Sequence, residues 1–403
     1  MKVVIAPDSF KESLAAPEVA EAIAQGVLAV APDATVDLCP MADGGEGTTD
    51  AMVAATGGSF LYADVYDPLG KPIRARLGLL GEANQPVLPG ELGVSAARAR
   101  SGTGDGNAGT AVIEMAAASG LALVPPDLRD PLRTTTFGTG LLMLAALDAG
   151  VREIIVALGG SATVDGGSGC VQAMGGVFTD ADGAPLVCGL AGGGLADLHA
   201  IDLSQLDPRL ANVRVRAACD VMNPLLGEHG AAAVYAPQKG ATPDAVLVLE
   251  QNLARFARVM VESLERNVAD LPGAGAAGGM GAGLAGLLGA SLERGGELVA
   301  ETVGLARRLH GADLCITGEG CLDTSTRYGK TAMTVADFAR IASVPCVCIP
   351  GRSASDAPAE SFAAVRPLVD GNVSTRMAME QPELLLKQRA TEAVRTMGLP
   401  GKS

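Results

Sequence analysis

The sequence contains no tryptophan, and aromatic residues make up only 3% of its 403 residues. Hydrophobic residues nevertheless account for 48% of the chain, which is enough for sizeable cores. These cores must therefore be aliphatic, with Ala, Val and Leu side chains and close backbone packing at glycine. A chain of this length commonly forms two domains.

Positive charge is also scarce, with 30 Lys and Arg against 45 Asp and Glu and a net charge of −15. No basic stripe is present, which argues against nucleic-acid binding. An acidic balance mainly favours solubility, and an anion can still bind where a site is locally positive. The sequence has no uninterrupted apolar run of about 18 residues, so we expect no membrane association, and the N-terminal apolar run is too short for a signal peptide.

Histidine is nearly absent, and the three that occur are scattered without zinc-binding spacing. Ser9, Ser161 and Cys321 lie in turns, but none has a histidine nearby in the sequence, which disfavours a Ser-His-Asp hydrolase. The eight cysteines form no C-x-x-C pair, and several lie in apolar, strand-like runs. Buried thiols of this kind suit a reducing compartment, so we expect a cytoplasmic protein.

Standard nucleotide-binding motifs are missing as well. The segment YGKT at 328–331 resembles the end of a Walker A loop, but Thr324 stands where its first glycine is needed. The segment GAGLAG at 281–286 matches G-x-G-x-x-G, although no clear strand precedes it. Two interpretations stay open for this glycine-rich region: a close-packed helix start, or a turn that cradles phosphate.

Glycine is abundant, with 53 residues, and both ends of the chain alternate between apolar strands, polar loops and helices. This alternation is typical of a parallel sheet covered by helices. Strands are predicted within residues 2–8, 34–47, 312–320 and 344–351. Helices are predicted within residues 13–32, 47–58, 331–343 and 382–398.

The middle of the chain follows another pattern. Residues 70–82 and 85–93 resemble antiparallel strands, and residues 107–124 resemble an apolar helix. We therefore predict an α/β fold with a discontinuous, Rossmann-like parallel-sheet domain over residues 1–68 and 285–403. An inserted α/β (α+β) domain would cover residues 69–284, with the active site in the cleft between the two domains. Two sequential domains are the alternative.

Acidic and glycine-rich loops follow the predicted strands. Ligands of open α/β sheets bind at the carboxyl ends of strands. Five of the six loops at these ends contain Asp or Glu, and they cover residues 6–13, 39–50, 157–169, 219–225, 316–326 and 349–355. One such loop alone is more often a solvated turn, but several together favour a site for Mg²⁺ and phosphate, in which glycine lets backbone N–H groups approach the anion.

Three lysines lie in polar loops near the ends of predicted elements. They are Lys11, Lys239 and Lys330. Any one of them alone is more often a surface charge, although Pro237 and Gly240 place Lys239 in a rigid turn. Phosphoryl transfer needs cations where negative charge is shared, so the three are candidate phosphate ligands.

Taken together, these loops resemble the glycerate kinase family of bacterial glyoxylate and glucarate metabolism. The resemblance spans most of the chain and rests on the segments IAPDSFKESLAA, PMADGGEGT, DPLRTTTFGTG, LGGSATVDGGSG, CDVMNPLLGEHGAAAVYAPQKGA, GAAGGMGAGL and ITGEGCLDTSTRYGK. It implies a two-domain α/β kinase that phosphorylates D-glycerate with ATP, at the 2-hydroxyl, to give 2-phosphoglycerate. The partners would be small molecules, with a homodimer left open.

Residue type and position suggest a role for each candidate. Asp220 is the predicted catalytic base, Asp165 is the alternative base, and Lys11 is the third catalytic residue. Asp43, Glu319 and Asp323 would hold Mg²⁺. The predicted phosphate and substrate ligands are Ser9, Lys239, Ser161, Gly159, Gly160, Gly278, Gly279 and Lys330.

Two residues depart from the family pattern within the predicted site. Val164 stands where the pattern has Asn, and Cys321 stands where it has Arg. These departures leave two alternatives to a glycerate kinase. One is a kinase of the same fold that acts on another small sugar acid, such as a four-carbon aldonate. The other is a non-catalytic homologue that binds a carboxylate or a nucleotide.

Overall fold

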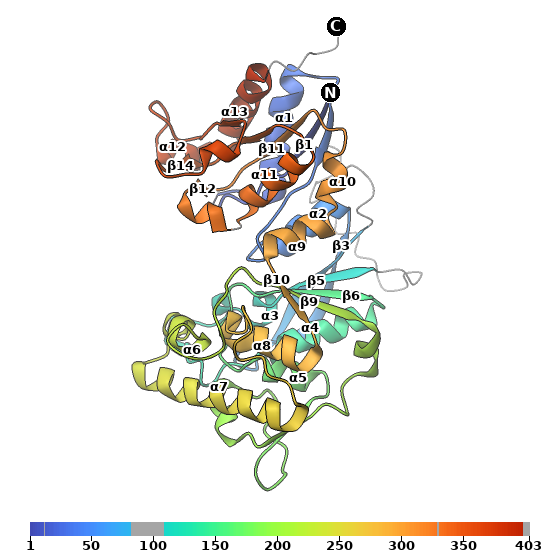
Figure 1. The fold of residues 1–403 in the computed structure, drawn as a ribbon, viewed down its shortest axis with the longest axis vertical. Helices are drawn as coiled ribbons and strands as arrows, with labels where there is room; N and C mark the ends of the chain where they lie inside the picture. The colour runs from blue at the N-terminus through green and yellow to red at the C-terminus, as the bar shows by residue number, and fades with distance from the viewer. Residues whose placement is uncertain (12, 82–108, 329, 398–403) are drawn as a thin grey trace.

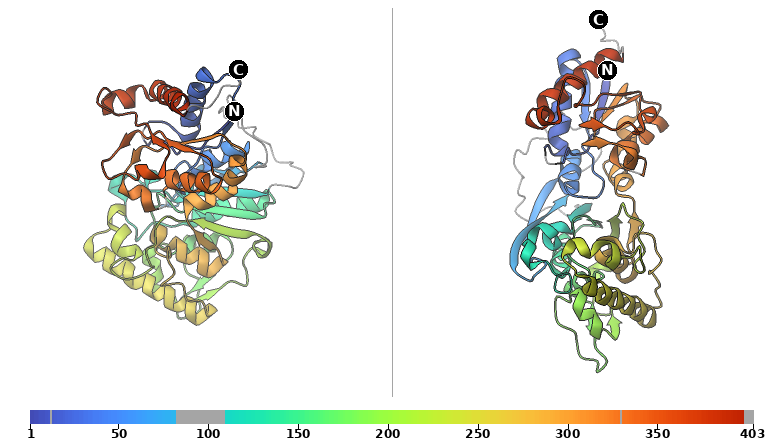
Figure 2. Two further views of the ribbon diagram at one scale, coloured as in Figure 1. Left: turned by 45° about the horizontal axis from the view of Figure 1, so that its top comes forward. Right: turned by 90° about the vertical axis from the view of Figure 1, so that its left-hand side faces the viewer.

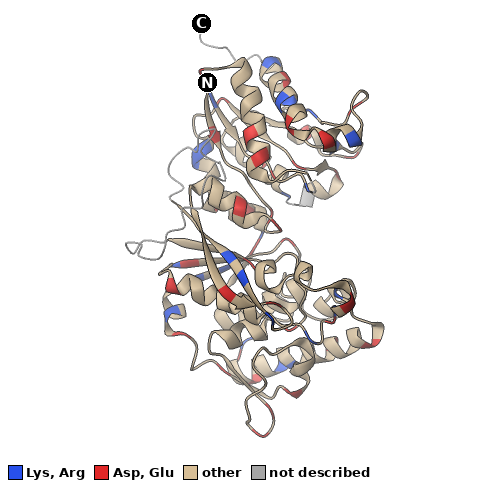
Figure 3. Cartoon of the chain, turned by 180° about the vertical axis from the view of Figure 1, so that it is seen from behind, with Lys and Arg blue, Asp and Glu red and all other residues tan. Residues whose placement is uncertain are grey.

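The computed structural model describes residues 1–403 apart from residues 12, 82–108, 329 and 398–403. Two bodies lie one above the other along the long axis of the molecule, and each contains a sheet (Figures 1 and 2). The N-terminus lies at the far end of the upper body, beside the last described helix, α13 (Pro382–Thr396) (Figure 1). On the face in Figure 3, Lys and Arg are interspersed with Asp and Glu.

The upper body contains a parallel five-stranded sheet built from both ends of the chain. Its strand order is β15-β13-β11-β1-β2. The strands are β15 (Ala364–Val365), β13 (Cys346–Cys348), β11 (Leu314–Thr317), β1 (Lys2–Ile5) and β2 (Thr35–Leu38). The pattern of short apolar strands and amphipathic helices at the two ends of the sequence thus produces one Rossmann-like sheet, as predicted.

Helices cover both faces of this sheet, because side chains alternate between the faces along each strand. Val3 and Ile5 of β1 pack with α1 (Ala16–Val30) and α13 (Pro382–Thr396). Val4 points to the opposite face and belongs to the cluster that contains α2 (Thr48–Thr56), α9 (Gly295–Thr302), α10 (Leu305–Leu309) and α11 (Thr331–Ile341). A smaller parallel pair, β12 (Cys321–Leu322) with β14 (Arg352–Ser353), lies beside it.

The lower body contains a mixed six-stranded sheet in the order β10-β9-β6-β5-β4-β3. Its strands are β10 (Ser291–Glu293), β9 (Arg214–Ala218), β6 (Glu153–Ala157), β5 (Thr110–Glu114), β4 (Pro72–Leu79) and β3 (Ser59–Tyr66). Pairing is parallel from β10 to β5 and antiparallel from β5 to β3. The antiparallel strand predicted within residues 70–82 is therefore confirmed, whereas residues 85–93 lie outside the described residues.

One face of the lower sheet packs against helices of the lower body. These are α3 (Ala116–Ser119), α4 (Phe137–Asp148), α5 (Ser168–Ala173), α6 (Ala231–Tyr235), α7 (Pro243–Leu264) and α8 (Ala276–Leu288). The hairpin of β7 (Val177–Thr179) and β8 (Ala200–Asp202) also packs in this body. The helix α12 (Thr375–Glu380) instead packs with α13 in the upper body. The other face of the lower sheet contributes Val112, Ile155 and Ala218 to the core cluster that holds Val4, so apolar packing joins the two bodies.

The helix predicted over residues 107–124 is wrong. The segment instead forms the strand β5 and then the short helix α3. Val112 and Ile113 are fully buried and point to opposite faces of the sheet. A parallel strand that is buried on both faces reads as a continuous apolar run, which resembles a buried helix in the sequence.

Two strands of the lower sheet lie outside the range 69–284 predicted for the inserted domain. These are β3, which precedes that range, and β10, which follows it. The domain boundaries at 68/69 and 284/285 stay a prediction. The sheet pairing adds that the lower sheet reaches beyond them at both ends.

Candidate active site

The strand order of the upper sheet creates a crevice between β1 and β11. From β1 the chain continues to β2 on one side, whereas β11, β13 and β15 are added on the other side. Loops that leave adjacent strands in opposite directions open a ligand site at their carboxyl ends. Here the loop after β1 meets the loop after β11, where the backbone N–H of Asp8 donates to the carbonyl of Gly318 at 2.8 Å.

A pocket of about 440 Å³ lies at this crevice, and we call it the switch-point pocket. It contains predicted residues from three separate loops. Its lining consists of Asp8, Ser9, Phe10, Lys11, Ser13, Asp43, Glu319, Gly320, Cys321, Lys330, Gly351, Arg352, Leu368, Val369, Thr375, Ala378 and Met379. The tertiary structure thus brings Ser9, Lys11, Asp43, Glu319 and Lys330 into one pocket.

Three carboxylates, Asp8, Asp43 and Glu319, line the switch-point pocket. Burial raises the pKa of Asp8 to about 6, with a further contribution from the negative charge of Asp43. Burial also raises the pKa of Glu319 to about 7, and Asp8 adds to this shift. Thr331 Oγ1 donates to Asp8 Oδ2 at 2.5 Å, and Thr326 Oγ1 donates to Glu319 Oε1 at 2.9 Å. Charged carboxylates that lose water and repel one another are suited to binding a cation.

Asp220 joins this cluster from the lower sheet, since it follows the carboxyl end of β9. Its Oδ1 accepts a hydrogen bond from the backbone N–H of Gly295 at the start of α9, at 2.8 Å. The surrounding protein raises the pKa of Asp220 to about 7 by removing water, and the charges of Asp43 and Asp8 raise it further. Residue 220 is nevertheless exposed. A carboxylate of this pKa can accept a proton near neutral pH.

Close backbone contacts hold the loops of the two sheets together. A Cβ on Gly295 would lie 1.9 Å from the carbonyl oxygen of Asp43, and a Cβ on Gly159 would lie 2.9 Å from Cα of Gly45. Only glycine permits approaches this short. The loop after β6 therefore lies against the Asp43 loop, which places the predicted Gly159–Gly160 turn at the edge of the carboxylate cluster.

Lys239, Ser161 and Asp165 form a separate, buried group behind that turn. Lys239 is only 2% exposed, and its Nζ donates to Ser161 Oγ and to the carbonyl of Thr163, both at 2.8 Å. Burial lowers the pKa of Lys239 to about 7. Asp165 is fully buried, and it accepts hydrogen bonds from the N–H and hydroxyl of Thr136 and from the N–H of Gly167. Burial raises the pKa of Asp165.

The predicted Gly278–Gly279 turn belongs to the same buried region. Both glycines have positive φ, +73° and +89°, and a Cβ on Gly278 would lie 1.9 Å from the carbonyl oxygen of Thr163. The backbone N–H of Gly166 donates to the carbonyl of Gly278 at 3.1 Å. Within α8, a Cβ on Gly283 would lie 2.2 Å from the carbonyl oxygen of Gly166. These contacts favour the close-packed helix start as the reason for the glycine-rich segment.

Asp323 differs from the other predicted metal ligands. Its Oδ1 accepts the backbone N–H of Ser325 at 2.8 Å, and it also bonds the Ser325 hydroxyl. These bonds lower the pKa of Asp323, with Lys330 contributing through its Nζ, which lies 3.9 Å from Oδ1. Asp323 therefore stabilises the turn that follows it, and it is not among the residues that line the switch-point pocket.

Two charged residues of the pocket, Asp8 and Arg352, have no assigned role in the sequence-based prediction. Asp8 lies in the loop that follows β1, so its position after a strand is the same signal that identified the other carboxylates. Arg352 lies in β14, which pairs in parallel with β12 so that Arg352 is opposite Cys321. The Arg352 side chain hydrogen-bonds the Cys321 thiol and acts against the rise that burial causes in the thiol pKa. Nothing in the sequence indicates this pairing, because the two residues are far apart along the chain.

Val164 does not lie in the site, contrary to the prediction. It is fully buried and belongs to the aliphatic core of the lower body. In the loop that carries it, Val164 and Asp165 are buried, whereas Gly159 is half-buried and Gly160 is exposed. A hydrophobic residue at 164 is therefore compatible with its surroundings and makes no contact with the switch-point pocket.

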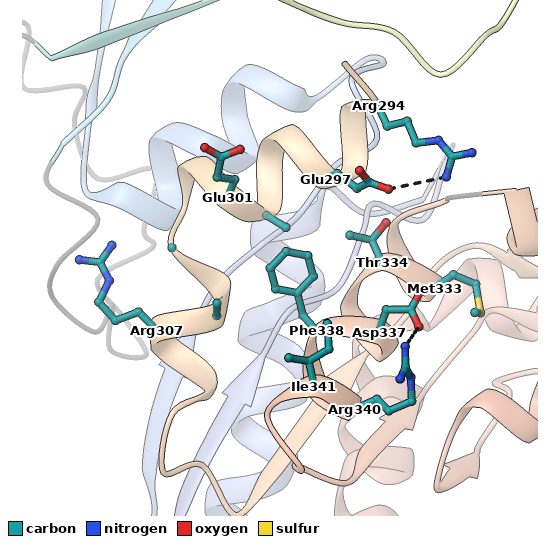
Figure 4. Close-up of a pocket in the computed structure, with 13 residues that line it drawn as sticks. Arg294, Glu297, Glu301, Arg307, Met333, Thr334, Asp337, Phe338, Arg340 and Ile341 are labelled. Atoms are coloured by element: carbon teal, nitrogen blue, oxygen red, sulfur yellow. Dashed lines mark hydrogen bonds and ion pairs between the residues drawn. The ribbon is translucent and has the colours of Figure 1, made fainter. Parts of the chain in front are cut away.

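A second groove, of about 700 Å³, lies between α9, α10 and α11 (Figure 4). Phe338 faces its centre, and its rim carries Arg294, Glu297, Asp337 and Arg340 (Figure 4). These charges pair with each other: Arg294 Nη1 lies 3.6 Å from Glu297 Oε1, and Arg340 Nη2 lies 3.0 Å from Asp337 Oδ1. Although this groove is the larger one, it contains none of the predicted site residues.

The described part of the chain contains no cluster of three or more His, Cys, Asp or Glu arranged to hold a metal on its own. Mg²⁺ commonly uses one or two carboxylates together with phosphate oxygens and water. Asp43 and Glu319, with Asp8 beside them, fit that requirement because all three residues line a pocket that is also lined by Lys11, Lys330 and Arg352. Among the described helices, none combines the length and the apolar character that a membrane span needs.

Comparisons with known proteins identify similar chains. The profile of a family described as "Glycerate kinase family" matches residues 3–398. A glycerate kinase of Bacillus subtilis (strain 168) is 44% identical, covering 99% of this chain and 98% of its own length. A glycerate 2-kinase of Escherichia coli (strain K12) is 47% identical, covering 88% of this chain and 86% of its own length. A crystal structure described as that of a candidate glycerate kinase 2 from Salmonella typhimurium LT2 superposes with a TM-score of 0.85, at 43% identity, and covers 99% of this chain and 98% of that one.

Proposed function

Because the chain belongs to the glycerate kinase family, we propose that it transfers the γ-phosphoryl group of ATP to the 2-hydroxyl of D-glycerate. The products are 2-phosphoglycerate and ADP. The observation that carries this proposal is the meeting of carboxylates from both sheets with Lys11, Lys330 and Arg352 beside the switch-point pocket. Positioning and electrostatic stabilisation are the main contributions of protein groups to phosphoryl transfer.

Asp220 is the proposed base. It accepts the proton of the attacking hydroxyl while the new O–P bond forms and the bond to the leaving ADP oxygen breaks. Its exposure and its pKa of about 7 support this role. Asp165 fits the role less well, because it is fully buried and its oxygens accept bonds from Thr136 and Gly167.

Asp43 and Glu319 are the proposed Mg²⁺ ligands, with Asp8 as a third carboxylate near them. A bound Mg²⁺ would neutralise the charge shared by the phosphate oxygens. The raised pKa values of Asp8 and Glu319 support this assignment, because both groups lie where a cation would favour their charged forms. Asp323 supports the site indirectly, through the turn that leads to Lys330.

Lys239 and Ser161 are proposed to hold the Gly159–Gly160 loop in place rather than to contact the substrate or the phosphates directly. Lys239 ties Ser161 to Thr163 from inside the lower body. With its loop held in this way, Gly160 remains exposed and Gly159 half-buried. Their backbone groups would then bind the substrate carboxylate or the transferred phosphate.

The free thiols of all eight cysteines support a cytoplasmic location.

The decisive experiment is phosphorus and proton NMR of the product formed from ATP and D-glycerate. We expect one phosphorus resonance coupled to the C2 proton, and none in the absence of glycerate. The Asp220→Asn variant is the matched control, because an asparagine oxygen can still accept the Gly295 N–H. Coupling to the C3 protons would refute the regiochemistry.

Two alternatives have distinct outcomes in the same assay. A panel of small hydroxy acids distinguishes a kinase for another sugar acid, in which glycerate is inert and a four-carbon acid is consumed. A non-catalytic homologue would bind ATP but release no ADP with any acid. The carboxylates gathered at the cleft favour catalysis, since a protein that only binds carboxylates has no need of such a set.

A further inference from the structure

We propose that Arg352 binds an oxyanion of the substrates in the switch-point pocket, and that it supplies the positive charge that residue 321 lacks in this chain. The inference rests on the proposed function and adds a substrate-binding residue to it. Cys321 stands where the family pattern has Arg, yet a guanidinium lines the same pocket from the neighbouring strand. The oxyanion is a phosphate group of the nucleotide or the carboxylate of the acid, and separate binding measurements distinguish the two.

Strand pairing places Arg352 and Cys321 side by side. The strands β12 and β14 are parallel, and Cys321 is the register partner of Arg352. Neighbouring strands lie about 4.8 Å apart, and side chains of register partners point to the same face of the pair. Both residues line the switch-point pocket, whereas Leu322, the next residue of β12, is fully buried. An arginine at either position would therefore present its guanidinium to the same side of the pocket.

Backbone contacts fix β14 against the loop after β11. The N–H groups of Gly351 and Arg352 donate to the carbonyls of Glu319 and Gly320, at 2.9 Å and 3.2 Å. A Cβ on Gly351 would lie 2.5 Å from the carbonyl oxygen of Gly320, so this approach requires glycine. The Arg352 side chain therefore extends from a fixed backbone, beside the segment that carries the proposed Mg²⁺ ligand Glu319.

Side-chain contacts hold the guanidinium without neutralising it. Arg352 hydrogen-bonds the Cys321 thiol, and this thiol in turn donates to Asp323 Oδ2 at 3.5 Å. Because burial raises the pKa of the thiol, it stays neutral and leaves the positive charge of Arg352 available. Among the described residues, no carboxylate forms an ion pair with Arg352, whereas Lys330 Nζ lies 3.9 Å from Asp323 Oδ1. A planar guanidinium in this state can donate two hydrogen bonds to one oxyanion.

Exchange of the two register partners is the central test. Arg352→Met keeps a long side chain and removes its charge. The double variant Cys321→Arg/Arg352→Cys returns a guanidinium to the pocket from the opposite strand. Arg376→Met is the matched control, because Arg376 is an exposed arginine of α12 that does not line the pocket. Calorimetric titration with Mg²⁺ present measures the binding of two probes to each protein, inorganic tripolyphosphate and D-glycerate, without turnover.

We expect Arg352→Met to weaken the binding of at least one probe by on the order of 10- to 100-fold, because charge-assisted hydrogen bonds are lost. The exchange variant should regain most of that affinity, and Arg376→Met should bind both probes as the wild type does. Weaker binding of tripolyphosphate assigns Arg352 to the phosphates of the nucleotide, and weaker binding of D-glycerate assigns it to the carboxylate of the acid.

The proposal is overturned if Arg352→Met binds both probes as the wild type does, or if the wild type binds neither. An equal loss in Arg376→Met also overturns it, because the effect is then one of overall charge. The same holds if the exchange variant unfolds at the wild-type midpoint but binds as weakly as Arg352→Met. A protein that shows the expected binding but does not phosphorylate glycerate would refute the proposed function and leave this inference standing.

Discussion

Glu319 provides the sharpest test of the electrostatics of the site. Its side chain is 6% exposed, and burial raises its pKa from 4.5 to about 7. A folded-state pKa above the unfolded value means that the folded protein holds a proton that the unfolded chain has lost. The free energy of unfolding therefore falls as pH rises from about 4.5 to about 7, and the loss is complete above that range.

The magnitude follows from the size of the shift. At about 1.4 kcal/mol per pKa unit, a rise from 4.5 to about 7 corresponds to roughly 3 kcal/mol of stability. This figure is an upper limit, because Asp8 contributes to the same shift and relaxes when Glu319 is neutralised. Glu319→Gln removes the charge and keeps an oxygen that can accept the Thr326 hydroxyl. We therefore expect the variant to be more stable than the wild type at about pH 8, by up to roughly 3 kcal/mol, and nearly equal at about pH 5.

The assay is urea unfolding of both proteins at the two pH values, without Mg²⁺. Asp323→Asn is the control, because hydrogen bonds from Ser325 lower the pKa of Asp323 in the same loop. That substitution should reduce stability slightly, by less than about 1 kcal/mol, at both pH values. Added Mg²⁺ should stabilise the wild type more than Glu319→Gln at about pH 8. If Glu319→Gln lowers stability at both pH values, the carboxylate is a structural group and the reasoning is refuted.

Three further outcomes follow from the geometry. Asp220→Asn should lower kcat by about 100- to 10,000-fold in steady-state assays, without lowering the unfolding midpoint. Because the pKa of Lys239 is lowered from 10.5 to about 7, the free energy of unfolding of the wild type should rise between about pH 7 and 10.5. In Lys239→Met, urea unfolding curves should no longer show this rise. The variant should also have a lower kcat, because Ser161 loses its hydrogen-bond partner. Gly278→Ala should lower the free energy of unfolding by about 1–3 kcal/mol, because its Cβ would meet a carbonyl oxygen. Gly289→Ala, which has a similar φ but open space around it, should lower it by less, and equal losses would contradict the steric argument.

Local sequence patterns were sufficient for much of the fold. Short apolar runs that end in polar, glycine-rich loops predicted the strands β1, β2, β11 and β13 and the helices between them, because strand and helix periodicities are local properties. The position of Asp43 and Glu319 just after such strands was enough to place both at the carboxyl edge of a parallel sheet. The pattern failed for β5, where burial on both faces removes the alternation that distinguishes a strand.

Only the tertiary structure decided which of the candidate residues act together. In the sequence, five acids lie in similar loops after predicted strands, and their local surroundings do not distinguish them: Asp43, Asp165, Asp220, Glu319 and Asp323. The fold separates them, since burial and hydrogen bonds place Asp165 inside the lower body and Asp323 in a turn. Asp43 instead lines one pocket with Glu319, and its charge raises the pKa of Asp220. Arg352 joins them through pairing between β12 and β14. Charge, burial and distance depend on contacts between segments that are remote in the chain, whereas the sequence alone determines the residue types and their local conformations.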